Sequence, residues 1–236
     1  MATWTMHLAI AKQLEKKINI TNKNEFYFGN IMPDLERWVV PDLNIYVEYK
    51  DSHYSVVNND IKNPIVIDLN KFYKLNEEEL KKHNSLIIGY YCHLIVDYYL
   101  NDIINSEKVS IFNEDDDFVG IYLNTGKILK CDKNKRKTFK HREYELFNKY
   151  LVDNFEIESP VVNEELFKSV KSLNNIKLLK EDIIKIVNKS KDLINPNTFK
   201  KFDYDYVMYN EKIMLELFNN SMDYIMKILK EKDLIK

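Results

Sequence analysis

The segment GYYCHLIVDYYLND, residues 89–102, places a histidine and an aspartate within an otherwise apolar run. They are His93 and Asp97, four positions apart. On a helix the two side chains lie about 40° apart on one face and can reach a common point. A buried carboxylate is costly unless an imidazole or a cation compensates it. The spacing therefore predicts either two ligands of one metal or a histidine hydrogen-bonded to an aspartate in a helical core.

A glycine and a second pair strengthen this pattern. Gly89 stands one turn before His93, where a glycine costs about 1 kcal/mol relative to alanine, and we interpret it as leaving room for another group. His141 and Glu145, in KHREYELF, repeat the four-residue spacing on a second expected helix. That pair is equally consistent with an exposed helical ion pair.

The remaining histidines carry less information when each is taken alone. His7 lies on an apolar helix face, where a histidine is more often a core residue than a ligand. His53 belongs to a segment expected to be a loop. His83 stands beside Lys81 and Lys82, and we expect it at the surface.

Five short segments between residues 6 and 145 resemble, in their order, the bacterial zinc-dependent phospholipase C family. This family is more distantly related to the single-strand-specific zinc nucleases of fungi. The segments are MHLAIA, FGNIMPD, DSHY, GYYCHLIVD and HREYE. The GN-x-x-PD turn and the G-x-x-x-H-x-x-x-D helix are their most specific parts, and residues 146–236 add only expected helices.

The resemblance implies an all-α bundle that holds up to three zinc ions and hydrolyses a phosphodiester or a related phosphate ester. The implied ligands are Asp34, His53, His93 and Asp97 for a central ion, His7 with Asp97 for another, and His141 with Glu145 for a third. Nitrogen and carboxylate ligands of this kind suit zinc. The resemblance also implies a catalytic role for Asp34, which would orient or deprotonate the attacking water.

Two features depart from the family's pattern. Secreted members use the N-terminal tryptophan of the mature chain as a ligand, whereas Trp4 is internal here and three residues from His7. The family also has a further histidine between its His-xxx-Asp and His-xxx-Glu pairs, and none lies between His93 and His141. Asp102 follows His93 by nine residues and so points to the opposite side of a continuous helix. We therefore expect one to three Zn²⁺ ions.

The elements that must position these residues are mostly helices. Only four glycines and five prolines occur in the chain, which favours long helices over a turn-rich sheet protein. Helices are expected at 5–18, within 26–34 before Pro33, and at 76–105, 138–153, 162–173, 180–193 and 203–232. Residues 35–76 are expected to form loops and short helices.

One exception to the helical pattern lies near residues 118–131. The alternating residues around Asn124-Thr125-Gly126 predict a small β-hairpin there. No repeat or linker divides the chain. We predict an all-α fold, in which residues 1–236 form a single domain, a helical bundle with a buried metal site.

Charge and composition exclude several classes of protein. Lys and Arg total 35 against 37 for Asp and Glu, so nothing favours a protein that coats nucleic acid. No apolar run approaches the roughly 18 residues of a transmembrane helix, and the N-terminus lacks the pattern of a secretory signal. We expect a cytoplasmic protein whose substrate is a small phosphodiester or a phospholipid. The sequence does not indicate an oligomeric state.

Two alternative functions stay open. An all-α nucleotide phosphohydrolase of the His-Asp type also carries metal ligands on helices, but it uses an adjacent His-Asp dipeptide, and this sequence contains none. The second alternative is a non-catalytic helical protein that keeps a metal for stability. It stays open because the ligand set lacks the family's further histidine. The basic run KNKRK, residues 133–137, suits a phosphate group or an anionic surface, although such a short run is usually only solvated.

Overall fold

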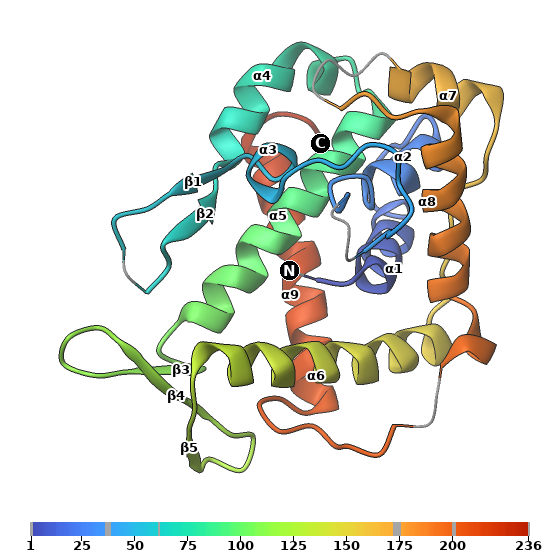
Figure 1. Ribbon diagram of the computed structural model, residues 1–236. Helices are drawn as coiled ribbons and strands as arrows, with labels where there is room; N and C mark the ends of the chain where they lie inside the picture. Colours follow the sequence, from blue (N-terminus) through green and yellow to red (C-terminus); the bar gives the residue numbers. More distant parts are fainter. Residues whose placement is uncertain (1, 36–38, 61, 172–175, 200–201, 236) are drawn as a thin grey trace.

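The computed structural model describes residues 2–35, 39–60, 62–171, 176–199 and 202–235 (Figure 1). Its α-helices are α1 (Trp4–Leu14), α2 (Lys23–Gly29), α3 (Tyr49–Ser52), α4 (Leu69–Lys81), α5 (Ser85–Asn105), α6 (Lys133–Asn154), α7 (Glu164–Lys171), α8 (Lys180–Leu193) and α9 (Glu211–Glu231). Its strands are β1 (Ser55–Val57), β2 (Ile65–Ile67), β3 (Ser110–Phe112), β4 (Phe118–Tyr122) and β5 (Ile128–Lys130), and a 3-10 turn, η1, covers Pro196–Thr198. Among the described residues, no helix combines the length and the apolar character needed to span a bilayer.

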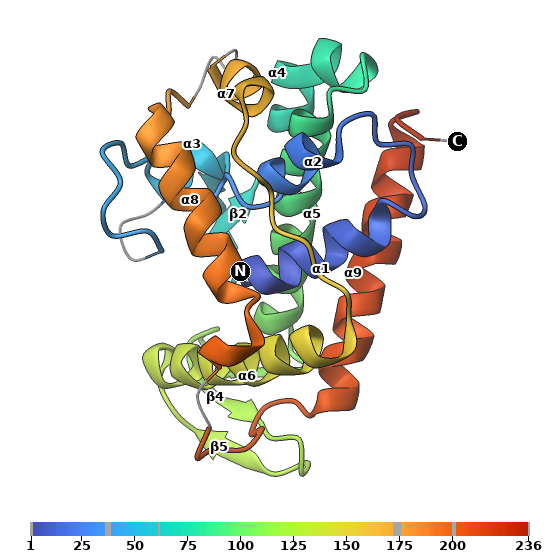
Figure 2. The same cartoon turned by 90° about the vertical axis from the view of Figure 1, so that its right-hand side faces the viewer.

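Helix α5 lies at the centre of the fold and packs against α2, α4 and α9 (Figure 1). Every residue from Ser85 to Asp97 is buried, which explains why this helix is apolar nearly all round. In Figure 2, α1 crosses in front of α5 and α9, both of which it contacts, and α6 crosses below it. The N-terminal helix is thereby held against the middle of α5, close to His93 and Asp97.

The single long helix expected at 76–105 is two helices in the structure. Helix α4 ends at Lys81, and His83 adopts a left-handed backbone with φ of 56°. The side chain of Asn84 then caps α5 by accepting hydrogen bonds from the backbone N–H groups of Leu86 and Ile87. Asparagine is among the preferred residues at this position, so the chain breaks where its own capping residue favours a new helix.

The all-α class predicted from the sequence is wrong, because the chain also forms two small antiparallel sheets. Strand β1 pairs with β2, and the other sheet has the order β3-β4-β5. Strands β4 and β5 occupy the segment near 118–131, and β3 adds a third strand to them. The strands contain only three to five residues each. Their β-branched and aromatic residues favour pairing, but such short runs do not stand out in a helix-rich sequence.

Helix α9 begins at Glu211 rather than near residue 203. The residues before it are held in a non-helical path by Glu143 of α6. Its buried carboxylate accepts hydrogen bonds from three successive backbone N–H groups, those of Val207, Met208 and Tyr209. Burial raises the pKa of Glu143, and the three backbone donors act in the opposite direction. This contact ties the segment before α9 to α6 and could not be read from local sequence.

Helices α2 and α5 meet at two glycines. A Cβ atom on Gly89 would lie 2.3 Å from the carbonyl oxygen of Phe26, and one on Gly29 would lie 2.2 Å from that of Leu86. Neither distance is possible without moving the backbone, so only glycine permits this approach. The close crossing places the turn that follows α2, which carries Asp34, directly beside His93.

Candidate metal centre

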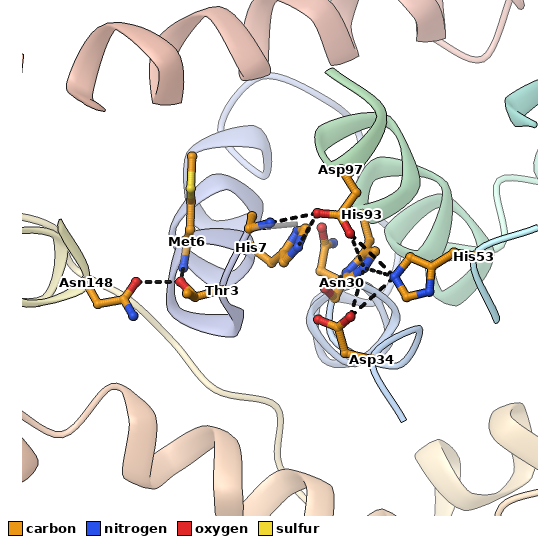
Figure 3. Close-up of polar contacts among 10 residues, drawn as sticks. Thr3, Met6, His7, Asn30, Asp34, His53, His93, Asp97 and Asn148 are labelled. Atoms are coloured by element: carbon orange, nitrogen blue, oxygen red, sulfur yellow. Dashed lines mark hydrogen bonds and ion pairs between the residues drawn. The ribbon is translucent and has the colours of Figure 1, made fainter. Parts of the chain in front are cut away.

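Five polar residues from four parts of the chain converge in the middle of the helices (Figure 3). His7 comes from α1, Asp34 from the turn after α2, His53 from the end of α3, and His93 and Asp97 from α5. All five are at most 3% exposed. Each of them was a candidate ligand from the sequence, and the structure brings them together.

Four of these residues surround one point. The Nε2 atom of His53 lies 3.2 Å from Nε2 of His93, 3.3 Å from Oδ1 of Asp34 and 3.4 Å from Oδ2 of Asp97. The Nε2 atom of His93 lies 3.6 Å from the same oxygen of Asp97 and 3.8 Å from that of Asp34. Zinc bonds of about 2.0–2.2 Å at tetrahedral angles separate neighbouring ligand atoms by about 3.3–3.6 Å. The measured separations are close to this range, so the four side chains are placed to share one Zn²⁺ ion.

The ring nitrogens that face away from this point are fixed by neighbouring groups. The Nδ1 atom of His93 lies 2.8 Å from the carbonyl oxygen of Asn30, which can only accept, so Nδ1 carries the proton and Nε2 has its lone pair free. The Nδ1 atom of His53 lies 2.9 Å from Oγ of Ser52. The Tyr90 hydroxyl in turn donates to the carbonyl oxygen of Ser52. Such outer contacts set the tautomer and orientation of metal-binding histidines.

His7 extends the cluster beyond the four residues. Its ring stacks on that of His93 with centroids 3.8 Å apart, and its Nε2 atom lies 3.5 Å from Oδ1 of Asp97. The backbone N–H of Ala2 donates to the same oxygen of Asp97 at 2.8 Å. Asp97 therefore presents one oxygen to the group of four and the other to His7, as a carboxylate between two cations would.

Several buried polar atoms of the cluster have no hydrogen-bond partner among the described residues. They are both ring nitrogens of His7, Oδ1 of Asp34, Oδ2 of Asp97 and Oδ1 of Asn30. An unsatisfied buried polar atom costs about 1–3 kcal/mol. The concentration of unsatisfied polar atoms in one cluster favours a bound cation that would satisfy them. Imidazole nitrogens and carboxylate oxygens are donors that suit zinc.

The pKa values show how the cluster balances its charge without a metal. Burial alone would lower the pKa of His53, but the facing carboxylates of Asp34 and Asp97 raise it to about 9. Burial and the neighbouring ring of His7 lower the pKa of His93 to about 3. Burial works against ionisation of Asp34, but the imidazoles of His93 and His53 outweigh it and lower its pKa. Near neutral pH and without a metal, His53 rather than His93 is therefore the imidazole that carries a positive charge.

His141 and Glu145 lie outside this group, on an exposed stretch of α6. Both line a pocket of about 660 Å³ that Asp34 also lines. Glu145 accepts a hydrogen bond from the Tyr204 hydroxyl at 2.6 Å. Burial, followed by the nearby ammonium groups of α6, lowers the pKa of His141. Their role as ligands of a third ion stays a prediction. Asp102 is exposed on α5, away from the cluster.

Two residues of the centre were not assigned a role from the sequence. Asn30 and Ser52 hold the outer nitrogens of His93 and His53. Asn30 lies in FGNIMPD and Ser52 in DSHY, so both stood within the segments that carry the resemblance. Their contribution depends on a backbone carbonyl and on a neighbouring ring, which residue spacing cannot reveal.

Comparison with known proteins identified one family. The family model described as zinc dependent phospholipase C matches residues 6–195, which is more than half of the chain and includes every residue of the centre. Neither the curated proteins nor the solved structures gave a match.

Proposed function

Since this chain belongs to the zinc-dependent phospholipase C family, we propose that it is a zinc-dependent hydrolase that cleaves a phosphodiester. Its substrate would be a phospholipid or a small phosphodiester. The observation that carries the proposal is the buried group of Asp34, His53, His93 and Asp97, whose four ligand atoms lie within 4.8 Å of one another.

In this proposal the four residues hold a central zinc ion, and His7 holds a second one together with Asp97. Bound zinc would lower the pKa of a water molecule towards neutrality and stabilise negative charge on the phosphoryl oxygens. His141 and Glu145 are proposed as ligands of a third ion at the pocket wall. This third site has less support than the central one, because no third described side chain forms a compact ligand group with His141 and Glu145.

Asp34 is proposed as the catalytic carboxylate. Of the five residues of the centre, it alone also lines the 660 Å³ pocket, so it stands between the metal ligands and the space for a substrate. Its lowered pKa keeps the carboxylate ionised near neutral pH. An ionised carboxylate in this position can orient the attacking water and accept its proton.

Metal analysis and hydrolysis of bis(p-nitrophenyl) phosphate test the proposal together. We expect the purified protein to contain zinc, to lose hydrolysis with a chelator and to regain it with added zinc. His93→Ala should weaken zinc binding by more than about 100-fold, since it removes a direct ligand. With saturating zinc, Asp34→Asn should lower kcat by about 10²–10⁴-fold.

His83→Asn is the matched control, because His83 is exposed and asparagine tolerates its left-handed backbone. This variant should keep its zinc and its activity. Full zinc content in His93→Ala would contradict the metal assignment. Zinc binding without hydrolysis of any phosphodiester would instead support the non-catalytic alternative.

A further inference from the structure

The pocket beside Asp34 is lined by three lysines on two helices. Lys137 and Lys140 come from α6, and Lys189 comes from α8. Lys137 and Lys140 are three residues apart, so they share one face of α6 with His141. The volume of about 660 Å³ lies within the usual range of small-molecule sites. The pocket therefore combines room for a ligand with a concentration of positive charge.

The three lysines have few carboxylates near them, although the negative charge of Asp97 acts on Lys140. None of them forms an ion pair in the part of the chain that the structure describes. The pocket holds two carboxylates, of which Asp34 belongs to the metal centre. The ammonium groups are thus available for an anionic ligand.

A second observation concerns Trp4, which lines the same pocket. Its side chain is 3% exposed, and its Nε1 atom has no hydrogen-bond partner among the described residues. An indole nitrogen can only donate, so it requires an acceptor. A negatively charged group of a ligand in this pocket would be such an acceptor.

We infer that the substrate carries a second anionic group besides the scissile phosphate, and that Lys137, Lys140 and Lys189 bind it. This inference rests on the proposed function and specifies its substrate class. The second group is a phosphate or a carboxylate attached to the alcohol portion of the ester. A zwitterionic ester with a quaternary ammonium group would place a cation against three ammonium groups and would be disfavoured.

Hydrolysis of three matched esters tests the substrate class. They are p-nitrophenyl phosphodiesters whose second alcohol is ethanol, choline or 3-hydroxypropionate. With the zinc-loaded full chain, we expect kcat/KM for the carboxylate ester to exceed that for the ethyl ester by about tenfold or more, because hydrogen bonds to charged groups are strong. The choline ester should be the poorest substrate. The preference should decrease at high salt.

Binding of unreactive phosphonates provides a readout that does not need turnover. By calorimetry, 3-phosphonopropionate should bind the zinc-loaded protein about tenfold more tightly than propylphosphonate. Lys189→Gln and Lys137→Gln should each reduce this ratio. Lys149→Gln is the control, because Lys149 is an α6 lysine that pairs with Asp153 outside the pocket, and it should keep the full ratio.

The two proposals fail in different ways. Equal binding of both phosphonates, or a choline ester cleaved as well as the carboxylate ester, would overturn the inference and leave the hydrolase proposal standing. Tighter binding of 3-phosphonopropionate without cleavage of any ester would overturn the hydrolase proposal and support an anion-binding pocket.

Discussion

His53 differs from the other imidazoles of the centre because it lies closest to two carboxylates. Its Nε2 atom lies within 3.4 Å of Asp34 and Asp97. His93 faces the same oxygens at longer distances, and the ring of His7 stacks against it. The two neighbouring imidazoles therefore have opposite pKa shifts, to about 9 for His53 and to about 3 for His93.

This difference predicts how the stability of the zinc-free protein depends on pH. A group whose pKa is raised in the folded state stabilises that state below its unfolded pKa and loses this effect as pH rises through the folded value. For His53 the loss falls between about 6.5 and about 9. His93 has the opposite shift, to about 3, and contributes no change above about 6.5. The free energy of unfolding should therefore fall as pH rises through this window.

Urea unfolding at several pH values measures this effect. The zinc-loaded protein is the control, because a metal-bound His53 has no proton to lose on its Nε2 atom and should show a flatter profile. A zinc-free protein whose stability rises or stays constant between pH 6.5 and 9 would contradict the charge distribution described for the centre.

At the residue scale, the sequence indicated which residues form the centre, but it did not indicate the groups that surround and orient them. The spacing of His93 and Asp97 indicated a shared target, and the resemblance supplied His7, Asp34 and His53. The helix periodicity could not show that Asn30 orients the His93 ring, because this contact uses a backbone carbonyl from another element. Lys137 belongs to the basic run 133–137 that the sequence indicated as suited to a phosphate group, but Lys189 joins it only in the folded chain.

Among the elements, the crossing of α2 and α5 decides whether the centre can form. Gly29 and Gly89 lie at the contact, and a side chain on either would meet the backbone of the other helix. Gly89 was interpreted from the sequence as leaving room for another group, and the structure shows that this group is α2. The turn after α2 carries both Asn30 and Asp34 to the cluster.

Gly89→Ala is therefore expected to destabilise the protein, although alanine normally stabilises a helix by about 1 kcal/mol relative to glycine. The added Cβ atom would lie 2.3 Å from the carbonyl oxygen of Phe26 and must push α2 away. Such overpacking typically costs about 1–3 kcal/mol. Because Asp34 moves with α2, zinc affinity should fall as well.

Urea unfolding and competition with a zinc chelator measure the two effects. Asp102→Ala is the control on the same helix, since Asp102 is exposed and distant from the crossing. It should change the free energy of unfolding by no more than about 0.5 kcal/mol. A Gly89→Ala protein that is more stable than the parent would contradict the close approach of the two helices.

The elements that the sequence predicted least well are those whose limits depend on distant contacts or on single residues. Helix α8 was expected at 180–193, where the structure has it, because its pattern and its acidic start are local. The break between α4 and α5 depends on the cap of Asn84. The late start of α9 depends on Glu143, and the strands β1 and β2 depend on pairing across an intervening loop.

In the molecule as a whole, the metal centre and the C-terminal helices are connected by packing. All five residues of the centre lie between positions 7 and 97, whereas α6, α8 and α9 come from the second half of the chain. Helix α1 contacts all three of these helices, and α5 contacts α9. That residues 1–236 form a single domain stays a prediction, and such packing between the two halves of the chain is what it requires.

A single domain predicts that zinc stabilises the C-terminal helices as strongly as it stabilises α1 and α5. A ligand present at about 100 times its Kd adds about 2.7 kcal/mol to the folded state, which corresponds to a rise in Tm of roughly 5–10 °C for a chain of this size. We expect one cooperative transition with and without zinc.

Hydrogen exchange read by mass spectrometry should show slower exchange in α8 and α9 when zinc is added, even though neither helix carries a ligand of the proposed centre. His93→Ala, measured with the same zinc concentration, is the control and should lose the added protection in all helices. Protection confined to α1, α2 and α5, or two separate melting transitions, would mean that the second half of the chain unfolds on its own.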